Sequence, residues 1–416
     1  MKKRQRLALA LALLLMTCGL VGGYGAWTIG LNYIQPAGPA GSPQIPFVIQ
    51  PGETTAQIGD DLVAKKIISN ALGFRLWARY KGLDHSIKAG VYQLSASMTI
   101  PEIVDKLQNF IPNEFQVKVF DGERIFQIVK DFASETRLQK FNSDDFLQIA
   151  KTGVYTNAAG KSVALASEYW FLNHDKQAGT APNFALEGYL FPDFFEVDQD
   201  ATAADIVHMM LNDFGEHLCP GPDGHPDAYL NDEQQCEAHP TQDPKTHQSI
   251  FDLLKKNYSD ADGKNMADKL FHALTLASIV EREALTASDD QGIAAVYYKR
   301  YLVSKGALQI KPGQEGVQKF QSDPTVSYSL GTADNAWPPV RSAGDTYNSG
   351  PYNTYHTVGL PPGPICSPAW AAVAATINPP STPYFFFFGD KKGIIRYAQT
   401  YQEQLANYQK YGLPTS

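Results

Sequence analysis

An uncharged, apolar segment near the amino terminus constrains this chain more than any other feature of its sequence. Residues 7–34 read LALALALLLMTCGLVGGYGAWTIGLNYI, and the next charged side chain after them is Glu53. A helix over residues 7–34 would be roughly 40 Å long, which is enough to cross the roughly 30 Å hydrocarbon core of a bilayer. A cleaved signal peptide has a shorter apolar core. The segment therefore predicts a retained transmembrane helix.

The residues that flank this segment predict its orientation in the membrane. The basic sequence MKKRQR precedes it, and positive charge is typical of the cytoplasmic side of a membrane helix. Trp27 and Tyr33 lie near the other end, where aromatic side chains suit the membrane interface. We therefore expect residues 1–6 to be cytoplasmic, residues 7–34 to cross the membrane once, and the rest of the chain to lie outside the cytoplasm.

Composition and charge limit what the rest of the chain can do. The chain has 416 residues, of which 44% are hydrophobic and 19% are charged. This mixture is typical of globular proteins, and the length allows two or three domains. The formal net charge is −8, from 35 basic and 43 acidic side chains. Nucleic-acid-binding proteins usually carry a basic surplus or stripe, so we expect no nucleic-acid partner.

Two folded parts are expected after the anchor. Residues 35–46 are rich in Pro and Gly, carry no charge and predict a linker. Residues 47–112 combine strand and helix patterns with turn signals between them, and they predict a small α+β module. Residues 113–416 predict a larger α+β domain, which an insertion at about residues 215–246 interrupts. The expected architecture is an anchor, a small module and a larger domain.

The opening of the small module, VIQPGETTAQIGDDL, resembles a LysM module. In such modules a Pro-Gly-x-Thr sequence turns a strand into the first helix, and the modules bind polymers of N-acetylglucosamine. The alternative is a small α+β module that binds nothing, because only the opening turn is specific.

Two cysteines lie in the insertion and allow two interpretations. Cys219 and Cys236 occupy a stretch rich in Gly, Pro and Asp, and outside the cytoplasm a disulfide between them is expected. Such a bond would stabilise the fold by roughly 3 kcal/mol. Zinc is the alternative, because His217, His225 and His239 lie close to the same pair. The spacing matches no standard zinc pattern, so we expect a disulfide and no metal.

A pair of glutamates at the end of an apolar helix pattern is the main candidate for chemistry. The sequence LTLASIVEREALTASD, residues 274–289, places Glu281 and Glu283 at the end of an apolar run. On a helix these side chains would lie about 200° apart, so they cannot act together across one substrate bond. An apolar collar raises the pKa of a carboxyl group, as a general acid near neutral pH requires. The collar favours Glu283 only slightly, and a solvated helix end without chemistry is the alternative.

Four motifs together resemble one protein family. LEGYLFPDFF, LASIVEREA, FQSDPTVSYSLG and GPYNTYHTVGLPPGPICSP occur in this order, and they look like the YceG-like family of membrane-anchored endolytic murein transglycosylases. The resemblance runs from the anchor to about residue 388 and includes the LysM-like module. It implies an enzyme of the bacterial cell membrane that cleaves the β-1,4 bond between N-acetylmuramic acid and N-acetylglucosamine in peptidoglycan strands. It also implies 1,6-anhydro ends, no cofactor, and peptidoglycan synthases as neighbours.

The resemblance implies a role for each glutamate of the pair. In the family the second glutamate of the Glu-x-Glu motif is catalytic, which corresponds to Glu283, so Glu281 is expected to support it. One carboxyl group is sufficient for this reaction, because the attacking hydroxyl belongs to the substrate itself and is held nearby. A hydrolytic glycosidase normally needs two carboxyl groups.

Other motif residues are candidates for sugar contacts, although each could instead shape a packed turn. They are Glu187 and Tyr189 from LEGYLFPDFF, Gln321 and Ser322 from QSDPTV, and Tyr352, Asn353, Thr354 and Tyr355 from PYNTY. The sequence departs from the family pattern in the extra segment IKPGQEGVQKF and at Gln404, where relatives typically have a histidine.

Two other functions remain open from the sequence. One is a hydrolytic muramidase, and the other is an inactive, membrane-anchored protein that binds peptidoglycan. A pyridoxal-phosphate lyase, a name that some family members have carried, is disfavoured because LTLASIVEREALTASD contains no lysine.

Overall fold

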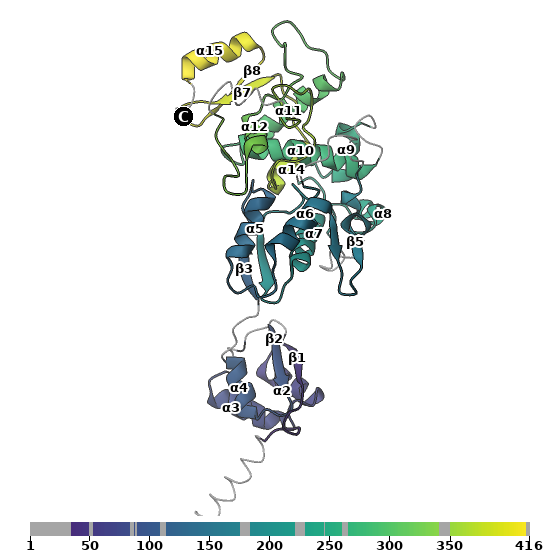
Figure 1. Cartoon of the computed structure of the whole chain (residues 1–416), viewed down its shortest axis with the longest axis vertical. Coiled ribbons are helices and arrows are strands. Elements are labelled where there is room, and N and C mark those ends of the chain that lie inside the picture. The colour runs from purple at the N-terminus through teal and green to yellow at the C-terminus, as the bar shows by residue number, and fades with distance from the viewer. Residues whose placement is uncertain are drawn as a thin grey trace, which may run out of the picture. The chain divides into compact units, whose positions relative to one another are not determined.

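The protein is described by a computed structural model, which covers residues 35–49, 53–83, 87, 90–108, 114–174, 184–220, 229–244, 246–259, 265–340 and 350–412. It divides into two compact units, Met1–Asn113 and Glu114–Ser416, here called unit 1 and unit 2 (Figure 1). The predicted anchor at residues 7–34 and the basic segment before it lie outside the described residues. Within the described ranges, no helix has the length and apolar character needed to cross a membrane.

The described part of unit 1 is a two-stranded antiparallel sheet with three helices. The sheet pairs β1 with β2 in a register that runs from Gln44 opposite Ser95 to Ile49 opposite Gly90. The elements are β1 (Gln44–Ile49), α2 (Thr55–Ala64), α3 (Ala71–Tyr80), β2 (Gly90–Ser95) and α4 (Ile100–Gln108). Their apolar faces meet in one core that includes Ile58, Phe74 and Ile103.

The start of α2 and the start of β1 each have a local cause in the sequence. Thr54 and Gln57 form a capping box at the start of α2. β1 begins at Gln44, so the last three residues of the expected linker belong to a strand instead. Pro46 is tolerated there because β1 pairs on one side only.

Unit 2 mixes short antiparallel strand pairs with many helices, which confirms a mixed α+β fold. The pairs are β3 (Glu114–Lys118) with β6 (Phe194–Asp198), β4 (Val154–Thr156) with β5 (Ser162–Ala164), and β7 (Phe386–Gly389) with β8 (Ile395–Ala398). The α-helices described are α5 (Ile125–Ser134), α6 (Ser143–Thr152), α7 (Ala203–Leu218), α8 (Glu233–Ala238), α9 (Ile250–Asn257), α10 (Met266–Glu283), α11 (Asp290–Ser304), α12 (Asp323–Leu330), α14 (Trp370–Ile377) and α15 (Tyr401–Tyr411).

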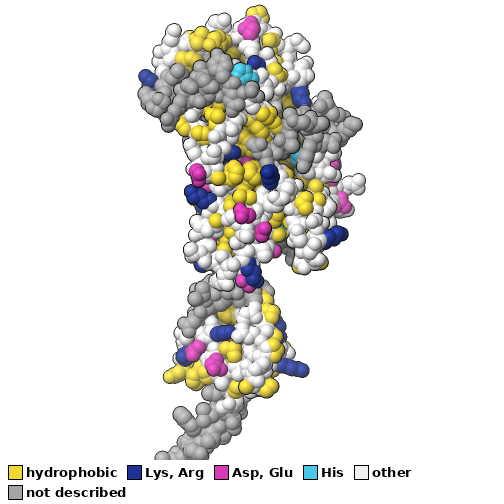
Figure 2. Space-filling model, in the orientation of Figure 1, with side chains coloured by type: hydrophobic (Ala, Val, Ile, Leu, Met, Phe, Trp, Pro, Cys, Tyr) yellow, Lys and Arg dark blue, Asp and Glu magenta, His cyan; other side chains and the backbone are white. Residues whose placement is uncertain are grey.

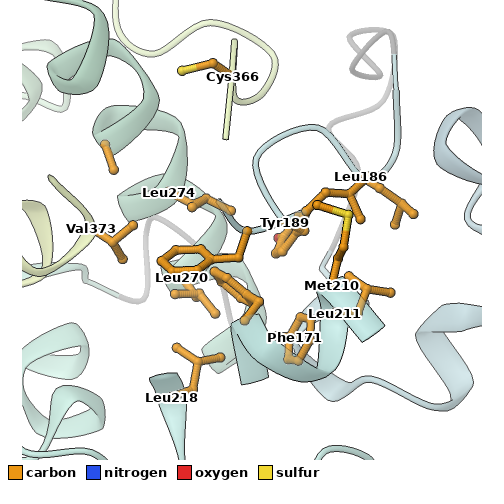
Figure 3. Close-up of a cluster of buried hydrophobic side chains, with 14 of the residues drawn as sticks. Phe171, Leu186, Tyr189, Met210, Leu211, Leu218, Leu270, Leu274, Cys366 and Val373 are labelled. Carbon is orange, nitrogen blue, oxygen red and sulfur yellow. The ribbon is translucent and has the colours of Figure 1, made fainter. Parts of the chain in front are cut away.

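Helix α10 lies at the centre of unit 2 because it is apolar around most of its circumference. Thirteen of its 18 residues are buried, and it packs against α9, α11, α12 and α14. Figure 3 shows Leu270 and Leu274 of α10 close to Val373 of α14 and to Tyr189. The helix is capped by Asn265 and ends at Glu283, after which Ala284 is extended. The end of a largely buried helix therefore carries the candidate carboxyl groups.

The insertion is closed by a disulfide. Cys219, which ends α7, is bonded to Cys236 of α8, and their Cα atoms are 5.2 Å apart. Both cysteines are buried. No group of three or more His, Cys, Asp or Glu side chains within the described ranges is arranged to hold a metal ion. His225, from the zinc alternative, lies outside those ranges.

Charges of both signs are interspersed on the face of unit 2 that Figure 2 shows. On that face the described basic side chains form no continuous stripe.

Candidate active site

Glu283 lines a cleft of about 690 Å³ in unit 2. The walls come from the end of α10, from α11, from the segment before α12, from the β7–β8 hairpin and from α15, which gather around one end of the unit in Figure 1. Polar side chains in the lining include Tyr297, Arg300, Gln321, Asp323, Tyr355 and Gln404. Aromatic side chains include Phe320, Phe386, Phe387, Phe388, Tyr401 and Tyr408. Such a mixture of rings and polar groups suits a carbohydrate.

The carboxyl group of Glu283 is held by one of its two oxygens. Tyr297 donates a hydrogen bond of 2.9 Å to Oε1, and Ser322 donates one of 2.7 Å to the same oxygen. Within the described residues, no donor bonds to Oε2. One oxygen therefore fixes the orientation of the carboxyl group while the other is left to exchange a proton with a ligand.

The surroundings of Glu283 act on its pKa in opposite directions. Burial raises the pKa by disfavouring the charged form, and the nearby charge of Asp323 raises it further. The hydrogen bonds from Ser322 and Tyr297 and the charge of Arg300 lower it, but the net effect is a raised pKa. A carboxyl group in this state can donate a proton, and its ionised form still has donors that stabilise it.

Arg300 carries its positive charge into the cleft from a buried position. Its Nε donates to the Phe385 carbonyl and its Nη1 donates to the Phe320 carbonyl, both at 2.7 Å. These bonds tie α11 to the segment before α12 and to the start of the β7–β8 hairpin. The guanidinium is therefore fixed in place before any ligand arrives.

Ser322 is positioned by a meeting of two sequence motifs. Its backbone N–H donates to Thr354 Oγ1 at 3.0 Å, and its carbonyl accepts a bond of 2.7 Å from Thr325 Oγ1. The Thr325 and Thr354 hydroxyls share a further bond of 2.9 Å. Just before this turn, Gln321 has a φ of 54°, a left-handed conformation that costs a non-glycine residue about 1–2 kcal/mol. The strained backbone at Gln321 thus directly precedes the residue that bonds to Glu283.

Asp323 and Tyr355 form a second polar pair in the lining. Tyr355 donates from its hydroxyl to Asp323 Oδ1 at 2.6 Å. Both residues line the cleft, and Asp323 is the first residue of α12. The negative charge of Asp323 is thereby held near Glu283, in agreement with its effect on the Glu283 pKa.

Glu281 lies outside the lining of this cleft. Its Oε2 accepts a hydrogen bond of 3.0 Å from the backbone N–H of Ala369, just before α14. Burial raises its pKa, and that bond lowers it. The contact joins the last turn of α10 to a separate loop, which fits a supporting role better than a role in the chemistry.

The two residues predicted from LEGYLFPDFF are buried away from the cleft. Glu187 is 1% exposed, and it accepts hydrogen bonds from the Ile125 backbone N–H at 3.1 Å and from the Tyr328 hydroxyl at 3.2 Å. Tyr189 is fully buried and packs against Phe171, as Figure 3 shows. The expectation of direct sugar contact is therefore replaced for both residues by a role in packing.

Three of the four residues predicted from PYNTY are also buried. Asn353 and Thr354 are 0% exposed, and Tyr352 packs its ring 4.7 Å from that of Tyr328. The Asn353 carbonyl accepts bonds from the backbone N–H groups of His356 and Thr357, which closes the loop. Their burial corrects the expectation that these three side chains touch sugar. Tyr355 alone from this motif lines the cleft.

The structure also brings residues to the cleft that the motifs did not indicate. Tyr297 and Arg300 lie one turn apart on α11, and the β7–β8 hairpin and α15 add an aromatic wall. The run YFFFFGD is the signal for part of that wall. The extra segment IKPGQEGVQKF supplies Glu315 and Phe320 to the lining.

Comparisons with known proteins agree on one family. The sequence profile of the YceG-like family matches residues 47–410. The endolytic murein transglycosylase of Bacillus subtilis (strain 168) is 26% identical over 399 residues, which cover 93% of this chain and 90% of that protein. The endolytic murein transglycosylase of Streptococcus pneumoniae serotype 2 (strain D39 / NCTC 7466) is 23% identical over 396 residues, which cover 93% of this chain but only 62% of that longer protein.

A solved structure is also similar. The 2.6 Å crystal structure of a YceG-like protein from Listeria monocytogenes matches 87% of this chain and 98% of its own chain, with 24% identity and a TM-score of 0.48. Because the family profile spans most of the chain, from the small module to α15, this chain belongs to the YceG-like family.

Proposed function

We propose that this chain is an endolytic murein transglycosylase, and that Glu283 is both its catalytic acid and its catalytic base. The observation that carries the proposal is the Glu283 carboxyl group, half-buried at the end of α10 in the lining of a cleft, with one oxygen held and the other without a donor among the described residues. The names of the curated relatives support the same activity.

The chemistry requires one carboxyl group acting twice. Protonated Glu283 donates its proton to the glycosidic oxygen between N-acetylmuramic acid and N-acetylglucosamine, and the bond from that oxygen to C1 breaks. The muramic 6-hydroxyl then bonds to C1 and gives its proton to the Glu283 carboxylate. The product is a 1,6-anhydro end, no water is consumed, and Glu283 is again protonated.

The groups around Glu283 suit both halves of this cycle. Burial favours the protonated acid, which is needed first. Arg300 and the donors Ser322 and Tyr297 favour the carboxylate that forms next. Since all three are held by the fold, little reorganisation is needed when the charge appears.

One observation favours hydrolysis as a second candidate. Asp323 places another carboxylate in the lining of the same cleft, and hydrolytic glycosidases use two carboxyl groups. Against this role, Tyr355 already occupies Asp323 Oδ1. A muramidase would add water to the broken bond, whereas a transglycosylase would not.

We further propose that residues 7–34 anchor the enzyme in the bacterial cell membrane, with residues 1–6 in the cytoplasm. Unit 2 then acts outside the cytoplasm on strands made by peptidoglycan synthases. The LysM-like module at residues 47–112 would hold N-acetylglucosamine-containing strands beside it. Gln321 and Tyr355 are the sugar-binding candidates that line the cleft. Ser322, predicted with them, is fully buried and bonds to Glu283 instead, which corrects the expectation that it contacts sugar.

The experiment that separates these functions is digestion of purified peptidoglycan in water enriched in ¹⁸O. A transglycosylase produces 1,6-anhydro ends without ¹⁸O, and mass spectrometry would show them. A muramidase produces reducing ends that carry ¹⁸O. If neither end appears while the protein still binds sacculi, the chain is an inactive binding protein and the proposed activity is wrong.

A further inference from the structure

Part of the cleft lining has no role in the reaction described above. We call it the C-terminal wall, and it consists of Phe386–Gly389 and Ile395 from the β7–β8 hairpin together with Tyr401, Gln404 and Tyr408 from α15. Gln404 is 3% exposed, whereas its helix neighbour Tyr401 is 52% exposed. A polar amide is thus buried in a wall that otherwise consists largely of aromatic and apolar groups.

The orientation of the Gln404 amide is fixed by its neighbours. Its Nε2 donates to the Phe387 carbonyl at 3.0 Å and to the Tyr408 hydroxyl oxygen at 2.9 Å. The reverse orientation would place the Gln404 carbonyl against the Phe387 carbonyl, which cannot donate a hydrogen bond. The Gln404 Oε1 atom therefore accepts a hydrogen bond from neither partner.

This arrangement leaves an acceptor on Gln404 and a donor on Tyr408 unused among the described residues, on two side chains that are joined by the bond of 2.9 Å. Oε1 of Gln404 is buried and has no hydrogen-bond partner within the described part of the chain. The Tyr408 hydroxyl accepts from Gln404, and no acceptor for its own proton lies among the described residues. Buried polar atoms are nearly always paired in native proteins. The unpaired Gln404 Oε1, together with the open donor of the half-buried Tyr408 in the same cleft wall, therefore points to a group that a ligand supplies.

A single chemical group can satisfy both atoms. A hydroxyl oxygen can donate its proton to Gln404 Oε1 and accept the proton of Tyr408 at the same time. A carboxylate cannot donate, and an ammonium cannot accept. A secondary amide points its N–H and its carbonyl in opposite directions, so it cannot serve both atoms. The pair is complementary to a hydroxyl.

On the basis of the proposed function, we infer that Gln404 and Tyr408 form a subsite for one sugar hydroxyl of the glycan strand. The surrounding rings suit this ligand, since Phe388 packs 4.6 Å from the Tyr408 ring and Phe387 also lines the cleft. Rings cover the apolar face of a sugar, and the polar pair then fixes its orientation. The subsite fixes where the glycan strand lies in the cleft, and it takes no part in proton transfer.

The test measures binding of a β-1,4-linked N-acetylglucosamine oligomer by calorimetry, in the Glu283→Gln background so that no cleavage occurs. Gln404→Met and Tyr408→Phe should each weaken binding by about tenfold or more. The double variant should be hardly weaker than either single variant, because both residues hold the same hydroxyl. Gln409→Met, the same substitution on an exposed position of α15, should bind normally.

Controls keep the outcomes distinct. Tyr408→Phe keeps the ring and tests the subsite even if Gln404→Met unfolds the helix, and thermal unfolding of each variant shows which case applies. Unchanged affinity in both variants would mean that Gln404 and Tyr408 hold a water or a packing defect, and it would overturn the subsite. Additive losses would show two separate contacts and would also overturn it. If the wild-type chain cleaves nothing but these affinities still change as expected, only the proposed function fails.

Discussion

Ser322 donates a hydrogen bond of 2.7 Å to Oε1 of Glu283, although 39 positions separate the two residues in the chain. The bond joins the turn before α12 to the last residue of α10, and it is the direct link between two of the motifs that mark the family. Because Oε1 is occupied in this way, Oε2 is the oxygen that, in the proposed reaction, acts on the glycosidic bond.

Replacing Ser322 with alanine should slow the reaction and shift its pH dependence. The lost bond to a charged group is worth about 1.5–3 kcal/mol, so kcat/KM should fall by roughly ten- to a hundredfold. The bond lowers the pKa of Glu283, so its removal raises that pKa and the acid stays protonated to higher pH. The alkaline limb of the pH–rate profile should therefore move upward.

A matched control for this variant lies on α12, the helix that follows Ser322. Ser329→Ala removes a hydroxyl that bonds to the Thr325 carbonyl and should leave the profile unchanged. An alkaline limb that stays in place in Ser322→Ala would show that Glu283 is not the group that titrates there.

Replacing Gln321 with glycine should relieve the backbone strain at this position and remove a side chain from the cleft, and these two effects can be measured separately. Glycine adopts a φ of 54° without penalty, so the melting temperature should stay level or rise slightly. The substitution removes a side chain that lines the cleft, so KM should increase several-fold. Lys66→Gly, at a φ of 58° in unit 1, should show the same stability effect without the change in KM. An unchanged KM in Gln321→Gly would remove Gln321 from the sugar-binding candidates.

Glu187 should make the stability of unit 2 depend on pH. Burial raises its pKa to about 7, against which Arg124 and the bonds from Ile125 and Tyr328 act only in part. Folding therefore favours the protonated carboxyl group. The resulting stabilisation is complete below the unfolded pKa of about 4.5 and is lost as the pH rises through about 7.

Glu187→Gln should remove this contribution, because a glutamine stays uncharged and can still accept from the Ile125 N–H. Melting temperatures of the two proteins, measured from pH 4.5 to 8, should diverge in favour of the variant as the pH rises. Parallel curves would show that the Glu187 carboxyl group does not titrate in this range.

Removing the disulfide should lower stability without affecting catalysis. The bond closes a loop with a sequence separation of 17 residues, for which loop entropy gives about 3 kcal/mol. Neither Cys219 nor Cys236 lines the cleft of Glu283. Reduction of the intact protein should therefore lower the unfolding midpoint in denaturant while the cleavage rate below that midpoint stays constant. A rate that falls in step with reduction would connect the insertion to the active site.

The sequence predicts much of the fold near Glu283, for identifiable reasons. The run from Leu274 to Val280 is mostly apolar and carries no charge, which favours a buried helix, and these residues of α10 are buried. The angle between Glu281 and Glu283 follows from helix geometry, so their separate surroundings could be expected. Whether Glu281 or Glu283 faces the cleft depends on how α10 packs against α11 and α14. No local sequence pattern contains that information.

For the sugar-binding candidates, the residue type alone could not predict whether a side chain contacts the ligand or packs inside the fold. Asn353 and Thr354 have side chains that could bind sugar or close a loop, and only their burial decides between these roles. Arg300 looks like an ordinary helix residue until the fold brings the Phe320 and Phe385 carbonyls to it. The left-handed conformation of Gln321 has no sequence signal at all.

The most direct test of the catalytic role compares Glu283→Gln with Glu281→Gln in the rate at which 1,6-anhydro ends form on purified peptidoglycan. Loss of a general acid and base costs about 10²- to 10⁴-fold, so Glu283→Gln should lose that much or more. Glu281→Gln can still accept from the Ala369 N–H and should stay within about tenfold of the wild type. Anhydro ends formed by Glu283→Gln at the wild-type rate would contradict the proposal that this carboxyl group moves the proton.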